Sequence, residues 1–346
     1  MTKNTFWTAF KYLLAAGVLC YVVYSNWDGD EGLNTVWQRS IHGSFLLLAI
    51  LLHASSQAAC IVRWYLLVRA QELPFTMLAA FRLGTLASLC NAFMPGAVGG
   101  DVVKAAALAR EQSSKTIAVA TVVMDRAMSL WGLVFIVALV GGACWACGLL
   151  DEAVLVPAQV VIAASLIGVV ASAVVWIGMG LMSRQRADRI GARLRETPKI
   201  GASLGELWQS VWLYRYRPAS VANAILLTTF SNVCDILAFC CYAHMFWDGL
   251  SNNPLPSVID HFLLVPMGLV ISGVPLFPGG AGIGEAGFGG LYVLFGSAQA
   301  NGVLASLLFR VCGWIIGIVG YVACGLLSVD SHAADGQKMR AQSLLP

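Results

Sequence analysis

The chain has 346 residues, of which 58% are hydrophobic and only 11% are charged, and its formal net charge is +3. Soluble globular chains carry roughly 45–50% apolar and about 25% charged residues, whereas the mean hydropathy here is +0.76. This composition excludes a soluble enzyme, a disordered chain, a nucleic-acid-binding protein and a disulfide-stapled secreted domain. Because about 20 consecutive apolar residues span a bilayer, the many apolar runs predict an all-α polytopic membrane protein.

Six long apolar runs predict six full membrane spans. The first run, residues 6–24, could pass for a signal peptide, but an acidic loop follows it and no small-residue cleavage site is present. We therefore expect an uncleaved first span. The other five runs lie at about 43–67, 117–149, 154–182, 219–247 and 302–328.

Two further apolar regions, about 76–110 and 257–296, are each interrupted by a Pro-Gly turn that small residues and then an acid follow. Transmembrane segments tolerate Pro and Gly where a helix is interrupted. The turn positions are Pro95, Gly96, Gly99, Gly100, Pro278, Gly279, Gly280 and Gly282. The acid precedes an arginine in the next long span by 25 residues in both regions, as Asp101 before Arg126 and Glu285 before Arg310.

The distribution of Lys and Arg gives the orientation. With the N-terminus inside, Arg39 is the sole base in an outside segment, and each broken region enters and leaves on one face. The broken regions then read as two re-entrant hairpins, the first opening inside and the second outside. The units 43–149 and 219–328 therefore predict an inverted repeat, an architecture of many secondary transporters; the alternative is a chance similarity of two turns.

The remaining segments connect these units. Residues 1–42 are expected to form the first transmembrane helix and an outside loop, and residues 150–218 a connecting span followed by a basic segment. The Arg-rich part, 183–218, predicts an amphipathic helix on the anionic inner leaflet, with a solvated cytoplasmic loop as the alternative. The polar cytoplasmic tail, 329–346, is expected to be disordered from Asp330 onward.

Few charges remain inside the predicted membrane segments: Arg63, Arg82, Lys104, Arg126, Arg310, Asp101, Asp125, Asp235 and Glu285. A charge at the bilayer centre costs roughly 2.5–3.5 kcal/mol on insertion scales, so such groups persist when they are paired, face a wet cavity or lie near headgroups. All except Asp235 are candidate substrate-binding residues, because clustered bases bind an anionic headgroup. The second arm of each hairpin would also present a helix N-terminus to an anion.

Structural roles are the alternative for several of these charges. Asp101 with Arg126, and Glu285 with Arg310, are natural ion pairs that could hold helices together. Asp125, next to Arg126, needs a separate partner. Two other bases, Arg63 and Arg82, lie near the inner ends of their helices and could instead reach the interface. For Asp235 a hydrogen-bonded structural role is favoured over a coupling-ion site.

Neither a metal nor a cofactor is predicted. The five histidines are scattered, and nearly all ten cysteines fall within apolar runs, where a thiol acts as a small hydrophobe. The lone C-x-x-C at Cys144 and Cys147 has no second pair and no histidine beside it. No Walker loop or H-E-x-x-H motif is present, so ATP-driven pumping within this chain is not expected.

These residues carry a family resemblance. The resemblance rests on Arg63-Trp64, Asn91 to Asp101 with Lys104, Asp125-Arg126, and the 278–285 turn. With these residues the chain resembles the lysylphosphatidylglycerol synthase transmembrane-region (flippase-like domain) family over about 40–328. In the bifunctional synthases this region translocates an aminoacylated phospholipid made by a separate soluble domain, for which 346 residues leave no room. Members often carry Arg where this chain has Lys104, so bidentate headgroup binding there is in question.

The resemblance implies a flippase-like, non-enzymatic integral membrane protein of a bacterial inner membrane, with both termini cytoplasmic. It would translocate or bind an anionic or aminoacylated lipid (phospholipid, hopanoid or polyprenyl-linked), and it does not name that lipid. Its expected partners are membrane lipids and a separate lipid or glycan synthase, with no nucleic acid. A membrane-embedded lipid-modifying enzyme using the same acids and bases and an accessory scaffold for such a synthase are the competing hypotheses.

Overall fold

The computed structural model describes residues 3–28, 32–38, 40–94, 99–111, 115–150, 155–198, 201–246, 254–273 and 279–342, and within these ranges the regular structure is helical. The tips of both predicted hairpins, with Pro95, Gly96 and Pro278, lie outside the described residues. The helices are α1 (Lys3–Ser25), α2 (Gly43–Ala70), α3 (Met77–Phe93), α4 (Gly99–Glu111), α5 (Lys115–Ile136), α6 (Gly142–Ala146), α7 (Leu155–Leu181), α8 (Arg184–Arg195), α9 (Gly201–Leu213), α10 (Pro218–His244), α11 (Val258–Ser272), α12 (Ile283–Leu294) and α13 (Gln299–Gln342).

Five helical stretches in the described part are long and apolar enough to cross a membrane: Gly43–Ala70, Lys115–Ala146, Val156–Leu181, Pro218–His244 and Gln299–Leu326. They match five of the six predicted spans, and the protein is an integral membrane protein. A π-helical turn, Val137–Gly141, joins α5 to α6 within the second stretch. The first predicted span coincides with α1, of which only the shorter Lys11–Ser25 part has described side chains.

Four shorter helices occupy the two broken regions. At 1.5 Å rise per residue, the 13-residue α4 is about 20 Å long, which is less than the roughly 30 Å hydrocarbon core. The partners α3 and α4 pack against each other, as do α11 and α12. We call α3–α4 the first helix pair and α11–α12 the second helix pair.

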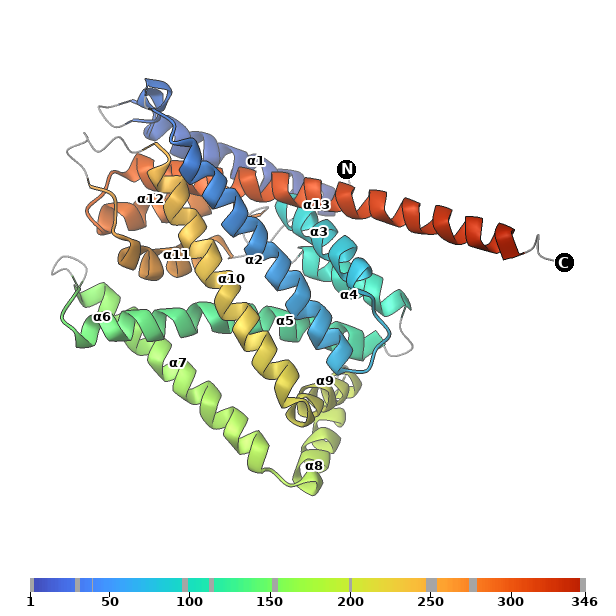
Figure 1. Ribbon diagram of the computed structural model, residues 1–346. Helices are drawn as coiled ribbons and strands as arrows, with labels where there is room; N and C mark the ends of the chain where they lie inside the picture. The colour runs from blue at the N-terminus through green and yellow to red at the C-terminus, as the bar shows by residue number, and fades with distance from the viewer. Residues whose placement is uncertain are drawn as a thin grey trace.

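The helices α2 and α10 run antiparallel through the centre of the molecule, with the first helix pair on one side and the second on the other (Figure 1). The contacts on the two sides correspond: α2 touches α3 and α5, as α10 touches α11 and α13. In the same way, α4 packs on α5, and α12 packs on α13. Each side also contacts the other: α3 packs on α13, and α11 packs on α5. A shift of 184 residues carries Gly99 onto Ile283 and Lys115 onto Gln299, so α4 and α12, and likewise α5 and α13, begin at equivalent positions.

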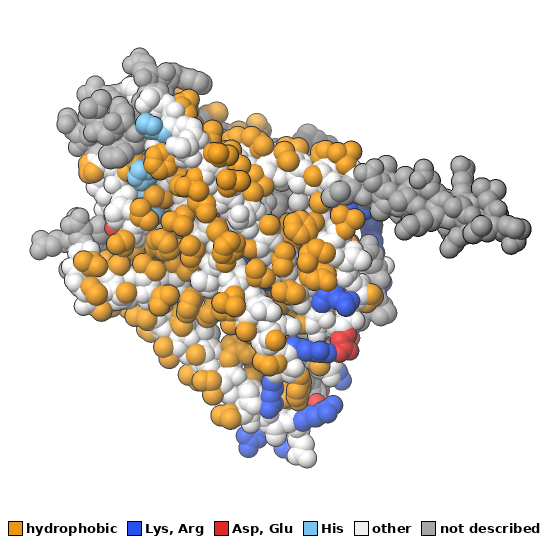
Figure 2. Space-filling view, viewed as in Figure 1, with side chains coloured by type: hydrophobic (Ala, Val, Ile, Leu, Met, Phe, Trp, Pro, Cys, Tyr) orange, Lys and Arg blue, Asp and Glu red, His pale blue; other side chains and the backbone are white. Residues whose placement is uncertain are grey.

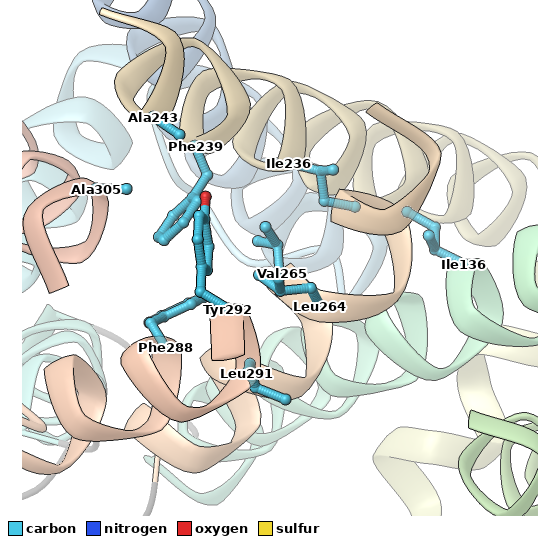
Figure 3. Packing of buried hydrophobic residues seen from close by; sticks show 10 residues of the cluster. All are labelled: Ile136, Ile236, Phe239, Ala243, Leu264, Val265, Phe288, Leu291, Tyr292 and Ala305. Carbon is cyan, nitrogen blue, oxygen red and sulfur yellow. The ribbon is translucent and has the colours of Figure 1, made fainter. Parts of the chain in front are cut away.

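The main hydrophobic core lies where the second helix pair meets α10 (Figure 3). Aromatic rings fill its centre, since the Phe239 ring stacks on Phe288 at 4.3 Å between centroids and lies 6.5 Å from Tyr292. Aromatic pairs at such distances contribute beyond their burial. The buried members are Ile136, Ile236, Phe239, Ala243, Leu264, Val265, Phe288, Leu291, Tyr292 and Ala305.

The predicted surface helix at 183–218 is two helices. Its arginines on α8 are exposed, whereas Ala187 and Gly191 are buried against α9, and the Trp208 indole N–H donates to the Ala187 carbonyl. Lys and Arg side chains gather around this end of the molecule, and the rest of the visible face is mainly hydrophobic (Figure 2). The helix α13 extends to Gln342, into the tail that the sequence predicts to be disordered.

Gly100 allows α4 to approach α3 closely. A Cβ at this position would lie 2.1 Å from the Ala87 carbonyl oxygen, so Gly100→Ala is expected to lower the free energy of unfolding by about 1–3 kcal/mol. Thermal unfolding of the purified protein in detergent measures the effect. Gly290→Ala is the matched control, since nothing lies within 4 Å of its Cβ position; equal melting temperatures for the two variants would contradict the close approach.

Candidate functional site

The charges of the first unit form a buried cluster around Asp125. The Arg63 Nε donates to one carboxylate oxygen at 2.8 Å, and the Lys104 Nζ to the other at 3.3 Å. Arg63 also donates to the hydroxyls of Thr228 and Ser129, at 3.1 and 2.6 Å. We call Arg63, Lys104 and Asp125 the Asp125 cluster. It joins α2, α4 and α5, and through Thr228 it reaches α10.

Two bases share one acid in the Asp125 cluster, which therefore carries a net positive charge. The side chains of Arg63 and Asp125 are only 2% and 6% exposed. The Lys104 ammonium also lies 4.9 Å from the centre of the Trp64 ring, an arrangement in which the ring face stabilises the cation. Lys104 at this position thus acts as a compact charge between a carboxylate and an aromatic face.

The prediction that Arg63 could reach the interface was wrong, because its three hydrogen bonds hold it inside the helix bundle. Arg82, by contrast, is exposed on α3. It lies outside the Asp125 cluster, so the structure does not bring these two bases together.

Arg126 lies on a different face of α5 from Asp125, as adjacent helical residues must. Its Nε is 3.9 Å from the Asp101 carboxylate, and its side chain is 36% exposed. The Asp101 Oδ2 makes no hydrogen bond to any residue that the structure describes. This pair is therefore looser and more accessible than the Asp125 cluster.

The corresponding pair of the second unit, Glu285 and Arg310, is in direct hydrogen-bonding contact. The Arg310 Nε donates to Glu285 at 2.7 Å, and the other Glu285 oxygen accepts the Gly282 backbone N–H at 2.7 Å. Arg310 also donates to the carbonyl oxygens of Gly279 and Gly280. These glycines and Gly282 have φ of 55°, 71° and 84°, a region that L side chains rarely adopt. Glu285 and Arg310 thus fix the turn that begins α12.

Aromatic residues occupy, in the second unit, the place that the Asp125 cluster holds in the first. The 184-residue shift that relates Asp101 to Glu285 also relates Lys104 to Phe288 and Asp125 to Phe309. Phe239 of α10 contacts both rings, at 4.3 and 5.7 Å, as Arg63 of α2 contacts its cluster. We call Phe239, Phe288 and Phe309 the Phe239 cluster. Corresponding helix contacts thus surround buried ions in one unit and aromatic rings in the other.

A polar cavity of about 230 Å³ lies where the two helix pairs meet. Ser88 and Asn91 from the end of α3 line it, together with Ser272 and Gly279 of the second helix pair. The other lining residues come from α11, α12, and the spans α2 and α13: His53, Gln57, Leu269, Phe288, Ser306, Phe309, Arg310, Gly313 and Trp314. We call this space the central cavity.

The sequence interpretation missed His53, Gln57 and Asn91. His53 is 5% exposed, stacks on Phe309 at 4.2 Å, and has an Nδ1 that bonds to no described residue. The signal was present, since polar residues at positions 53, 56, 57 and 63 recur along one helical stripe of an apolar run. Asp235 of α10 lies near Ser56 and Cys60, and its Oδ1 makes no hydrogen bond to the described residues.

A larger cavity of about 660 Å³ lies between α5, α7, α9 and α10. Its walls are mainly apolar, with Met124, Trp131 and Trp176 among them. The two cavities differ in kind, because the central cavity offers hydrogen-bonding groups and this one offers apolar surface.

Comparison with known proteins identifies the family of the chain. No curated protein matches it. The family model described as "Lysylphosphatidylglycerol synthase TM region" matches residues 9–320, which is most of the chain and includes the Asp125 cluster and the central cavity. The protein therefore belongs to the lysylphosphatidylglycerol synthase transmembrane-region family.

Proposed function

We propose that this protein translocates a lipid headgroup across the membrane through the central cavity, as a flippase. The observation that carries the proposal is that both helix pairs contribute to one polar cavity inside an otherwise apolar bundle. A polar headgroup needs hydrogen-bonding partners on its way through hydrocarbon, because an unpaired polar group there costs several kcal/mol. The apolar cavity beside α7 suits acyl chains.

The inverted repeat is part of this proposal. The corresponding contacts of α2–α5 and α10–α13, the antiparallel α2 and α10, and the common 184-residue shift all support two units related by a pseudo-two-fold axis. The short helix pairs would be re-entrant hairpins that gate opposite faces. With the N- and C-termini in the cytoplasm, the exposed arginines of α8 would face the anionic inner leaflet of a bacterial inner membrane.

Arg126, which does not line the central cavity, is the base that we assign to the phosphate of a phospholipid substrate. Lys104 and Arg310 are already held by carboxylates, whereas Arg126 has one long contact to Asp101 and a partly exposed side chain. A guanidinium can bind a phosphate with two parallel hydrogen bonds. The Asp125 cluster would position α4 and α5 around it.

We propose transport without catalysis. Asp125 accepts hydrogen bonds from two bases, and Glu285 from Arg310 and the Gly282 N–H. A general base must be free to reach the proton that it removes, and these carboxylates are engaged. The lipid would then be supplied by a separate synthase.

Arg126→Ala is expected to lower the rate of fluorescent-phospholipid translocation in proteoliposomes by about 10–100-fold. The estimate is the roughly 1.5–3 kcal/mol of a charged hydrogen bond converted to a rate ratio. Arg189→Ala, an exposed arginine of α8, is the control that should keep the wild-type rate. Wild-type rates in folded Arg126→Ala protein would refute the role of Arg126, and absence of translocation by wild-type protein would refute the flippase.

A further inference from the structure

The polar side chains of the central cavity both donate and accept hydrogen bonds. The Asn91 carbonyl oxygen accepts the Gly100 N–H at 2.7 Å, which leaves its two amide N–H donors for another partner. The Gln57 amide nitrogen reaches the Gly313 carbonyl at 3.5 Å, so its oxygen is an available acceptor. A ligand that fits both groups must itself carry donors and acceptors.

The central cavity has little charge to offer. Among the lining residues that the structure describes, Arg310 is the single charged one, and Glu285 with two glycine carbonyls accepts three of the five N–H groups of its guanidinium. No acidic side chain is among the lining residues that the structure describes. An ammonium group placed here would lack the carboxylate that burial of a cation requires.

His53 supplies the observation that points to a ligand. Its side chain is 95% buried, it lines the cavity, and its Nδ1 has no hydrogen-bond partner among the described residues. Leaving a buried polar atom unpaired costs about 1–3 kcal/mol. The Nδ1 has less than 1 Å² of accessible surface, so a hydroxyl group in the cavity reaches it only when the imidazole ring turns on its stacking contact with Phe309.

Aromatic faces complete the lining. Phe288, Phe309 and Trp314 lie on the walls beside the amides and the serine hydroxyls. This combination suits a group that has hydroxyls at its edge and C–H bonds on its face. At about 230 Å³ the cavity is smaller than the roughly 300–1,000 Å³ pockets that enclose whole drug-sized ligands, which suits a headgroup alone.

We propose that the central cavity selects an uncharged, hydroxyl-rich terminal group of a lipid headgroup, such as a hexosyl or polyol group, over an aminoacyl group, while a phosphate in the same headgroup lies at Arg126 outside the cavity. His53, Gln57 and Asn91 are its specificity residues. This inference rests on the proposed lipid-transport function and names the substrate class for it.

Retention of lipids by the purified protein tests the proposal. Protein prepared in a detergent without a sugar headgroup is incubated with equal amounts of monoglucosyldiacylglycerol, phosphatidic acid and lysylphosphatidylglycerol of the same acyl chains. Native mass spectrometry then counts the lipids that stay bound. We expect the glucosyl lipid to be retained at least about tenfold over the other two, because a site built to bind hydroxyls rejects ligands that lack them.

The variants remove single hydrogen-bonding groups and keep side-chain shape. Gln57→Leu and His53→Phe should each reduce the preference for the glucosyl lipid by about tenfold, the equivalent of one lost buried hydrogen bond. Ser55→Ala is the control, since Ser55 lies on the exposed face of α2 and bonds to its own helix. All three variants are compared by thermal unfolding, so that a folding defect is recognised.

Three outcomes would overturn the proposal. These are equal or greater retention of lysylphosphatidylglycerol, an unchanged preference in folded Gln57→Leu and His53→Phe, and displacement of the glucosyl lipid by methyl glucoside at equal concentration. The last outcome would indicate a site for free sugar. Lipid retention does not require transport, so the two hypotheses are tested separately. Absence of translocation in proteoliposomes would refute the flippase function, and the retention experiment alone decides the headgroup preference.

Discussion

Asp125→Ala is expected to lower the free energy of unfolding by about 3–5 kcal/mol. The substitution leaves the charges of Arg63 and Lys104 buried without their shared carboxylate. Reversible unfolding in mixed detergent micelles, followed by tryptophan fluorescence, measures the change. The physical cause is the uncompensated charge, since breaking a buried ion pair costs far more than the pair contributes.

The triple variant Arg63→Met, Lys104→Met, Asp125→Leu separates this cause from simple loss of packing. Replacing all members of a buried ionic cluster with apolar residues is often neutral, so most of the lost stability should return. The exposed pair of Arg217 with Glu72 is the control, and Arg217→Ala should cost only about 0–1 kcal/mol. If the triple variant is as unstable as Asp125→Ala, the buried-charge explanation is wrong.

Glu285→Leu is expected to cost about 3–5 kcal/mol in the second unit. Glu285 is fully buried, and its removal leaves Arg310 without its carboxylate and the Gly282 N–H without an acceptor. The same unfolding experiment measures the loss. Adding Arg310→Met to Glu285→Leu should recover part of it, because the double variant contains no unpaired charge.

Ser257→Ala provides the comparison for Glu285→Leu. Ser257 caps the exposed start of α11, where its hydroxyl accepts the Asp260 N–H, and loss of such a cap costs about 0.5–2 kcal/mol. A Glu285→Leu effect no larger than that of Ser257→Ala would show that the buried pair does not stabilise the turn at Gly279 and Gly280.

Hydropathy and helix-breaking residues were sufficient to predict much of this fold. Five spans lie where apolar runs predicted them, since a membrane helix must be apolar over its full length. The broken regions contain the short helices α3, α4, α11 and α12, as their Pro and Gly residues predict. The spacing of 25 residues between acid and arginine also placed Glu285 beside Arg310.

The partners of Asp125 could not be predicted, because they depend on how helices distant in the sequence pack. Arg63 is 62 residues from Asp125, and sequence position near a helix end suggested the interface for its side chain. His53 was overlooked for a related reason. A single histidine in an apolar run shows its role only when Gln57 on the next turn and Asn91 on another helix are seen to line the same cavity.

The different contents of the Asp125 cluster and the Phe239 cluster have an energetic consequence. In an inverted repeat, exchanging the conformations of the two units produces the state that opens to the opposite face. Ions and aromatic rings respond differently to such a rearrangement, because only the ions gain or lose strong desolvation penalties. For the proposed flippase, the inward-open and outward-open states would then be unequal in free energy, and a gap of about 1.4 kcal/mol would already give a tenfold excess of one. Without lipid, the molecule would rest facing mainly one side of the membrane.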